Sequence, residues 1–439
     1  NNTAVGYNSL TANTTGASNT AVGQGALAAN TTGTQNTALG GEAGDAITIG
    51  RYNTALGYAA LTTDIDGDFS TAIGFGALQT QESDGANQAV HNTAVGSYAG
   101  NGLTTAIHST FVGGFAGGNA ALTGDNNTGV GYRSMYSNTS GSENTGLGKD
   151  ALFSNTVGAY NTAVGEGALY TNVDGSNSVA VGRLALYNQD PASAVNMHNT
   201  AVGYNAGGAV TVGINNTLIG ALAGDAIVGA QENTSLGVHA GGAVTEGDSN
   251  VFIGYNSGVH AQATITGGTN TIVGAYAHTT ADDSAAANGF GYNIAAIAGY
   301  TTVGVGDDDI RAAHGNTTWS TISDERVKKD ITDSTAGLSF INDLRPRTFK
   351  YKNKGDLPKE FNGYEEGSTE VYKNSNIHHG FIAQEVKAAI DSHSEITDGF
   401  KMWDVRESGQ QEVGEAAVIP ILVKALQELS AKNDALEAR

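Results

Sequence analysis

The chain has 439 residues, with 62 glycines, 4 prolines, no cysteine and a formal net charge of −22. Glycine without a Gly-X-Y period excludes collagen, and the lack of cysteine excludes disulfide staples and Cys-ligated zinc. There is no run of about 18 apolar residues, so we expect no membrane-spanning helix. The length allows two or three domains. Because the first residues, NNTAVGYNSL, already stand inside a repeat, we expect a longer protein.

The charge is unevenly divided along the chain. Residues 1–322 hold 5 basic and 22 acidic residues, a net charge of −17, whereas residues 323–439 hold 16 basic and 21 acidic residues, a net charge of −5. Nucleic acids and anionic lipids are bound through clustered Lys and Arg. We therefore expect no nucleic-acid partner and no membrane insertion.

A five-residue signature of the form N-T-A-V-G recurs through residues 1–285, mostly at a spacing of 17. A fixed period with a few longer steps is typical of stacked coils from which isolated loops grow. The signature starts at Asn2, Asn19, Asn36, Asn53, Ser70, Asn92, Ser109, Asn127, Asn144, Asn161, Ser178, Asn199, Asn216, Asn233, Asn250 and Asn270.

Four positions of each coil are restricted to particular residue types. The first signature residue is Asn or Ser, from which we expect a hydrogen-bonded ladder. The fourth is always Val, Leu or Ile, an aliphatic ladder, and the fifth is always Gly, where we expect a positive φ or a close approach to another backbone. The residue three places after this Gly is always Ala or Ser, which predicts tight approach to a neighbouring coil or chain.

Short β-prone runs joined by Gly and Asn turns predict a mainly β protein with a parallel β-solenoid, or β-roll, of about 17-residue coils. At roughly 4.8 Å per coil, sixteen coils would form a rod about 75 Å long. One coil of this size buries little apolar surface, and three chains side by side would bury much more. We therefore expect a homotrimer.

The coils resemble the head repeats of trimeric autotransporter adhesins of the YadA type, in which a parallel β-roll trimerises. The resemblance covers residues 1–285, although the usual coil of those heads is shorter than 17 residues. Residues 286–322 are less regular, with a last T-V-G sequence at 302–304. We interpret them as a connector that caps the open end of the solenoid, where unpaired strand groups would otherwise be exposed.

The stretch SDERVKK begins at Ser323, where the sequence changes from repeat to ordinary mixed composition. In one interpretation Ser323 simply caps a surface helix. A serine and a lysine five residues apart lie about 140° apart on an α-helix. Ser323 and Lys328 would therefore meet only if Ser323 lay outside the helix or Lys328 came from a neighbouring chain.

Four motifs follow one another in residues 323–439: SDERVKKDI, INDLRPRTFKYK, HHGFIAQEV and VIPILVKALQELSAKNDALE. Together they resemble the peptidase S74 domain, the C-terminal intramolecular chaperone of bacteriophage tail fibres and tailspikes, which trimerises the fibre and then cuts itself off. The resemblance implies that Ser323 is the nucleophile, Lys328 the base, and the bond between Ile322 and Ser323 the one that is cut. It implies an α+β fold for this domain.

Other residues of these motifs are candidates for a supporting role at the cut. A lysine accepts the proton of a serine only when it is neutral, which burial or a second positive charge favours, and Lys329 is a candidate for that charge. Asp324 lies in the same motif. The resemblance adds His378, His379, Gly380 and Gln384, each of which could equally be a packing residue.

The last helix carries apolar residues at the a and d spacing of a coiled coil. Pro420 is tolerated only in the first turn of such a helix. An amphipathic helix packed on its own domain is the alternative. The residues that step by three and four are Ile419, Leu422, Leu426, Leu429, Asn433 and Leu436.

The leading functional hypothesis is the distal part of a trimeric phage tail fibre, found in the virion, extracellular, and made in the host cytoplasm. The loops at 79–91 and 187–198 would meet a glycan or protein receptor on the bacterial surface, and a further N-terminal part would join other tail proteins. The alternatives are a bacterial surface adhesin, which needs an outer-membrane anchor, and a depolymerising tailspike, which needs a pair of carboxylates in a cleft.

The sequence predicts no cofactor and no metal. The acidic stretches DIDGD, at 64–68, and DDD, at 307–309, carry the oxygen ligands that calcium prefers but match no EF-hand loop. We expect solvated turns at both. The only enzymatic activity expected is a single self-cleavage of each chain.

Overall fold

A computed structural model of the chain describes residues 1–438 apart from 84, 86–87, 119–120, 260–264, 322, 362, 397–399 and 407. The chain divides into two compact units, Asn1–Ile322 and Ser323–Arg439.

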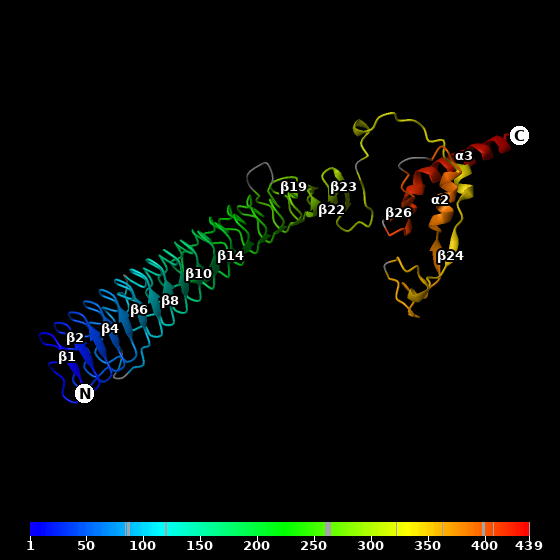
Figure 1. The fold of residues 1–439 in the computed structure, drawn as a ribbon. Helices are drawn as coiled ribbons and strands as arrows, with labels where there is room; N and C mark the ends of the chain where they lie inside the picture. Colours follow the sequence, from blue (N-terminus) through cyan, green and yellow to red (C-terminus); the bar gives the residue numbers. More distant parts are fainter. Residues whose placement is uncertain are drawn as a thin grey trace. The chain divides into compact units, whose positions relative to one another are not determined.

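The first unit is a parallel β-solenoid, as the repeat predicts, and Figure 1 shows its coils stacked one on the next from β1 to β22. Each coil contributes one short strand to a single sheet of 19 strands. The strands are β1 (Thr3–Val5), β2 (Thr20–Val22), β3 (Thr37–Leu39), β4 (Thr54–Leu56), β5 (Thr71–Ile73), β6 (Thr93–Val95), β7 (Thr110–Val112), β8 (Thr128–Val130), β9 (Thr145–Leu147), β10 (Thr162–Val164), β12 (Val179–Val181), β14 (Thr200–Val202), β15 (Thr217–Ile219), β16 (Thr234–Leu236), β17 (Val251–Ile253), β18 (Thr271–Val273), β20 (Asn288–Tyr292), β22 (Tyr300–Val305) and β23 (Asp308–Ala313).

The coils stack with every signature in register. Thr20, Ala21 and Val22 pair with Thr37, Ala38 and Leu39, and the same pairing repeats along the sheet. Since side chains of a strand alternate between its two faces, the third signature residue points inward and the second and fourth point outward. From Ala21 onward the third residue of every coil is buried.

The predicted asparagine ladder is present inside the coils. The backbone N–H of Asn36 donates to Oδ1 of Asn19 at 2.9 Å, and Nδ2 of Asn19 donates to the Gly33 carbonyl at 2.8 Å. The same two bonds recur at Asn144 and Asn161. Each buried amide therefore forms hydrogen bonds with backbone groups of the next coil, which is a structural role.

Both expected constraints, a positive φ and a close approach to another backbone, require glycine at the fifth signature position. Gly23 has φ +139°, and a Cβ atom there would lie 2.2 Å from the carbonyl oxygen of Gly40 in the next coil. The small residue three places later is buried within a single chain: Ser134, for example, donates from Oγ to the Gly146 carbonyl at 2.9 Å. Its close neighbour is therefore the next coil of the same chain.

The solenoid sheet continues past residue 285. β20 pairs with β18 and β22 pairs with β20, both in parallel, and β23 then turns back antiparallel along β22. The end of the stack is thus covered by a hairpin. Short parallel pairs also join β11 (Gly175–Ser176) to β13 (Val195–Asn196), and β19 (His278–Thr279) to β21 (Ala295–Ala296).

The acidic turn at 64–68 and the proposed receptor loop at 187–198 lie within the described residues. The DIDGD turn is not solvated, because Asp64 and Asp68 are buried: Asp64 accepts from Nε2 of Gln81 at 2.6 Å, and Asp68 pairs with Arg51 at 2.9 Å. Of the two proposed receptor loops, 187–198 is described and contains β13, whereas residues 84, 86 and 87 of the loop 79–91 lie outside the described residues.

The second unit is a small α+β domain. Two antiparallel pairs, β24 with β25 and β26 with β27, lie with its helices around a core that includes Phe340, Val386, Met402 and Ile421. Its elements are η1 (Glu325–Val327), α1 (Leu338–Asp343), β24 (Arg347–Phe349), η2 (Lys354–Asp356), β25 (His378–Gly380), α2 (Ala383–Asp391), β26 (Trp403–Val405), β27 (Gln411–Val413), η3 (Glu415–Val418) and α3 (Ile419–Glu437).

Helix α3 has two apolar faces. Ile421 and Ala425 are buried against the domain. The residues of the predicted coiled-coil seam do not take part in this packing, because all of them are exposed: Ile419, Leu422, Leu426, Leu429, Asn433 and Leu436. Packing on its own domain therefore uses a different face from the seam.

Candidate functional site

The structure brings Ser323 and Lys328 together. Nζ of Lys328 lies 2.7 Å from Oγ of Ser323, within hydrogen-bonding distance. Both side chains are exposed in the single chain. At this distance a protonated lysine donates a hydrogen bond to the hydroxyl oxygen. A neutral lysine at the same distance can accept the hydroxyl proton.

The local backbone explains how residues five apart meet. Only Glu325–Val327 are helical, in one 3₁₀ turn, and both Asp324 and Lys328 have extended backbones, with ψ of 134° and 151°. Ser323 therefore lies outside the helix, which is one of the two conditions for contact. The simpler expectation, a surface helix capped by Ser323, is wrong: Asp324 is the N-cap, and its side chain accepts from the Arg326 N–H.

Asp324 and Arg326 close this turn. The Asp324 carboxylate accepts from the backbone N–H of Arg326 at 2.8 Å and from Nε and Nη2 of the same side chain at 2.9 and 2.6 Å. These bonds hold the pKa of the Asp324 carboxyl below its ordinary value. Within the described part of the chain, Lys328 has no carboxylate within ion-pairing distance. The carboxylate closest in sequence to Ser323 is thus already paired with Arg326.

Lys329, the candidate second charge, is exposed beside Lys328. The ion pairs found between described residues do not include it. Its role as a second charge beside Lys328 stays a prediction.

His378, His379 and Gly380 form strand β25. They pair with Phe349, Thr348 and Arg347 of β24. Nε2 of His378 lies 2.8 Å from Oδ1 of Asn374, and the ring stacks on Phe349 with centroids 5.8 Å apart. These contacts give His378 a packing role within the sheet.

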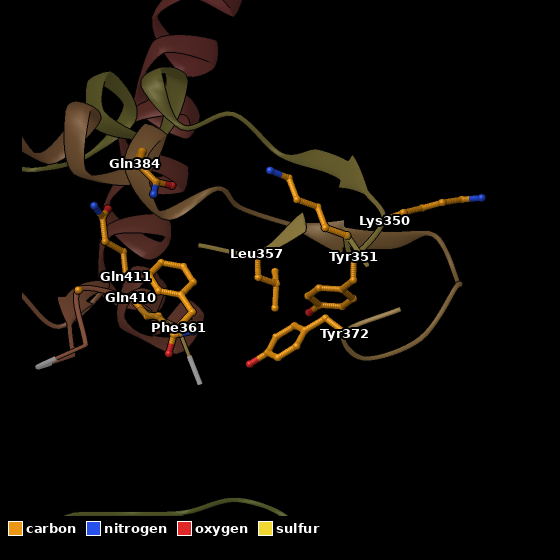
Figure 2. A pocket seen from close by; sticks show the side chains of 10 residues that line it. Lys350, Tyr351, Leu357, Phe361, Tyr372, Gln384, Gln410 and Gln411 are labelled. Carbon is orange, nitrogen blue, oxygen red and sulfur yellow. The ribbon is translucent and has the colours of Figure 1, made fainter. Parts of the chain in front are cut away.

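Gln384, at the start of α2, lines a cavity of about 310 Å³. Figure 2 shows it with Gln410 and Gln411 on one side and with the rings of Tyr351, Phe361 and Tyr372 below and beside them. No hydrogen bond or ion pair among the described residues joins Ser323 or Lys328 to His378, His379 or Gln384. Within one chain, the site is therefore a pair of residues.

A comparison with protein-family models gives one match. Residues 323–394 match the family described as chaperone of endosialidase, peptidase S74. The match covers the first part of the C-terminal unit, Ser323–Arg439, which is here called the peptidase S74 domain. Its first matched residue, Ser323, is also the first residue of the second compact unit. A search of curated proteins gave no match.

A β-solenoid followed by a C-terminal chaperone of the peptidase S74 family fits a tailspike or tail fibre. The likeness of the coils to YadA-type heads stays a prediction, as do the roles of the site residues. Over the described residues, no helix is long and apolar enough to cross a membrane, and no three metal-ligating side chains gather in one place.

An ion pair that sequence reasoning missed links two motifs of the peptidase S74 domain. Arg347 donates from Nε and Nη2 to the Glu385 carboxylate at 2.9 and 2.5 Å, which lowers the pKa of Glu385. The pair joins β24 to α2. Opposite charges in the motifs LRPRTF and AQEV were the only available signal, and sequence alone does not show that they face each other.

Proposed function

We propose that this chain is part of a trimeric phage tail fibre whose peptidase S74 domain assembles the trimer and then cuts itself off between Ile322 and Ser323. The observation that carries the proposal is the 2.7 Å contact between Lys328 Nζ and Ser323 Oγ, at the boundary between the solenoid and the domain that matches the family. Ile322 itself lies outside the described residues.

The proposed reaction is balanced within the chain and water. Neutral Lys328 takes the hydroxyl proton of Ser323, and Oγ attacks the carbonyl carbon of Ile322. The C–N bond breaks, the amine of Ser323 takes the proton back from Lys328, and an ester joins Ile322 to Oγ. Water then opens the ester, which leaves a carboxylate at Ile322 and a free amine at Ser323.

The exposure of the pair in one chain supports a link between cleavage and assembly. A lysine in open water is mostly protonated at neutral pH, and a packed neighbour that excludes water favours its neutral form. In this proposal a second copy supplies that neighbour. Cleavage would then wait until the trimer has formed.

The exposed seam of α3 supports trimerisation. Leu426 and Leu436 are 64% and 66% exposed, although they are spaced as a and d residues of a coiled coil. Five of the six seam residues are apolar, and α3 meets its own domain through Ile421 and Ala425 instead. Bundling of α3 helices from several copies would cover this seam.

The proposed fibre acts outside the cell as part of the virion and binds a glycan or protein on the bacterial surface. Its support is the rod shape of the first unit together with loops such as 187–198 that leave the regular coil. The other tail proteins and the receptor are partners that follow from this assignment.

The test is the denatured mass of the freshly expressed chain beside Ser323→Ala and Lys328→Ala, with Ser334→Ala as a control for a serine of the same segment. We expect two fragments, residues 1–322 and 323–439, for the natural chain and the control, and intact chains for the other two. Light scattering should give a trimer for all four. A natural chain that stays whole would overturn self-cleavage, and a monomer would overturn the fibre assignment.

A further inference from the structure

The fourth signature residue of each coil forms a continuous apolar column on the outside of the solenoid. It is Val, Leu, Ile or, once, Phe on eighteen successive strands, and none of these side chains is buried. The column, here called the aliphatic ladder, consists of Val5, Val22, Leu39, Leu56, Ile73, Val95, Val112, Val130, Leu147, Val164, Val181, Val202, Ile219, Leu236, Ile253, Val273, Phe290 and Val303.

The coil's own packing does not account for this column. The core of each coil is filled by the third signature residue, as at Ala163 or Phe252, and by residues of the turns such as Leu169. The fourth residue lies on the opposite face of the strand from the third. Polar side chains would be equally compatible with that face, as the threonines at the second position show. An apolar residue at every coil therefore indicates a contact made outside the coil.

The signature positions that face outward beside the ladder carry no charge. The first unit has a net charge of −17, so two copies repel each other over most of their surface. None of its charged residues occupies the second or fourth signature position, where the side chains are Thr, Val, Asn, Leu, Ile or Phe. Along these positions two acidic rods can approach without bringing like charges together.

The size of the ladder suits a stable interface. Eighteen strands at about 4.8 Å each extend on the order of 80 Å. A strip of that length and about 10 Å wide offers roughly 800 Å² per copy, the usual contribution of one partner to a stable interface. Monomers seldom expose a contiguous apolar patch of more than a few hundred Å².

We propose that copies of this chain pack against one another along the aliphatic ladder, parallel and in register. The repeat itself selects the partner, because apolar side chains interlock along the whole ladder only if the partner has the same rise per coil. A second copy of this chain has that rise. This inference rests on the proposed trimer and adds which face of the solenoid the copies share.

Cysteine cross-linking tests this proposal, since the natural chain has no cysteine. Leu236→Cys places a thiol on the ladder, and Val228→Cys places one on a return turn. The two natural side chains are 46% and 41% exposed, so neither substitution opens the core. In the full chain under mild oxidation, or with a short bismaleimide, we expect covalent dimers from Leu236→Cys and none from Val228→Cys.

The rate of labelling gives a second readout. In the trimer, a bulky maleimide-polyethylene glycol should modify Leu236→Cys at least tenfold more slowly than Val228→Cys under native conditions, and equally fast after denaturation. A trimer in which both thiols react at the same rate and Leu236→Cys does not cross-link would overturn the ladder interface and leave the trimer standing. That result would assign the ladder to another occupant, such as a bacterial surface molecule. A monomeric chain would overturn both proposals.

Discussion

The carboxylate of Glu428 accepts a hydrogen bond from the backbone N–H of Leu338 at 2.9 Å, across 90 residues of sequence. The N-cap residue of α1 is Gly337, which has no side chain to supply this bond. A Cβ atom at position 337 would lie 2.6 Å from Oε1 of Glu428. Helix α3 therefore caps helix α1, and glycine leaves the space for it.

Glu428→Ala should loosen α1. Loss of an N-cap acceptor typically lowers stability by about 1 kcal/mol, and Glu428 is the acceptor here. Hydrogen exchange of the α1 amides in the full chain should become faster, whereas Gln427→Ala, at the neighbouring exposed position of α3, should leave it nearly unchanged. Equal exchange in both variants would show that α1 is held by Phe340 and its apolar contacts alone.

His393 should make the stability of the peptidase S74 domain depend on pH. The imidazole is buried, with Nδ1 2.9 Å from Glu395 and Nε2 2.8 Å from Asp343. Hydrogen bonds to Glu395 and then to Asp343 raise the pKa of His393, and the same contact lowers the pKa of Glu395. The charged imidazolium can donate to both carboxylates at once.

Because the folded pKa of His393 is raised, its stabilisation is complete below the unfolded value of about 6.5 and is lost as pH rises through the folded pKa. The contribution of Glu395 has the opposite sense and is lost as pH falls through its lowered pKa. Denaturant unfolding of the natural chain and of His393→Gln should therefore differ most near pH 6 and converge in mildly alkaline buffer. A difference that grows with pH would contradict this assignment.

Arg326→Gln should slow the proposed self-cleavage. Without its guanidinium, the Asp324 carboxylate is left free beside Ser323 and Lys328, where an ion pair with Lys328 would favour the ammonium that cannot act as a base. We expect cleavage to be roughly tenfold slower at neutral pH and to reach half its maximal rate at higher pH than in the natural chain. Arg326→Lys keeps the charge without the paired geometry and should lie between the two. An unchanged pH profile would leave Arg326 only a structural role in the turn.

Asn161→Ala should destabilise the solenoid. Oδ1 of Asn161 accepts from the Ser178 N–H at 3.0 Å, and Nδ2 donates to the Gly175 carbonyl at 2.8 Å. Removing the amide leaves the buried N–H of Ser178 unpaired, at a cost of about 1–3 kcal/mol, whereas the Gly175 carbonyl keeps its hydrogen bond from Nδ2 of Asn172 at 2.8 Å. Thermal unfolding should show a smaller loss for Asn161→Ser, because serine occupies this position at Ser109 and Ser178. Thr162→Ala, on the outer face of the strand, serves as the control.

Part of the site was predictable from sequence because it depends on short-range geometry and on motif order. Ser323 and Lys328 are five residues apart, so one turn of backbone decides whether they meet. The sequence left open which turn forms, because a capped α-helix and a 3₁₀ turn suit the same residues. In the structure, the hydrogen bonds from Arg326 to Asp324 hold the 3₁₀ turn.

The repeat was enough to predict the solenoid, because a period of mostly 17 residues, with one aliphatic and one small residue at fixed places in each coil, is satisfied by stacking each coil on the next. Tertiary structure alone decided which face each repeated residue occupies. The aliphatic ladder and the buried third residue are both apolar, and only the direction of the strand places Ala163 inside and Val164 outside. It also decided the contacts between distant segments, such as Glu428 with Leu338 and Arg347 with Glu385, because such pairs depend on how helices and strands pack and leave no periodic trace in the sequence.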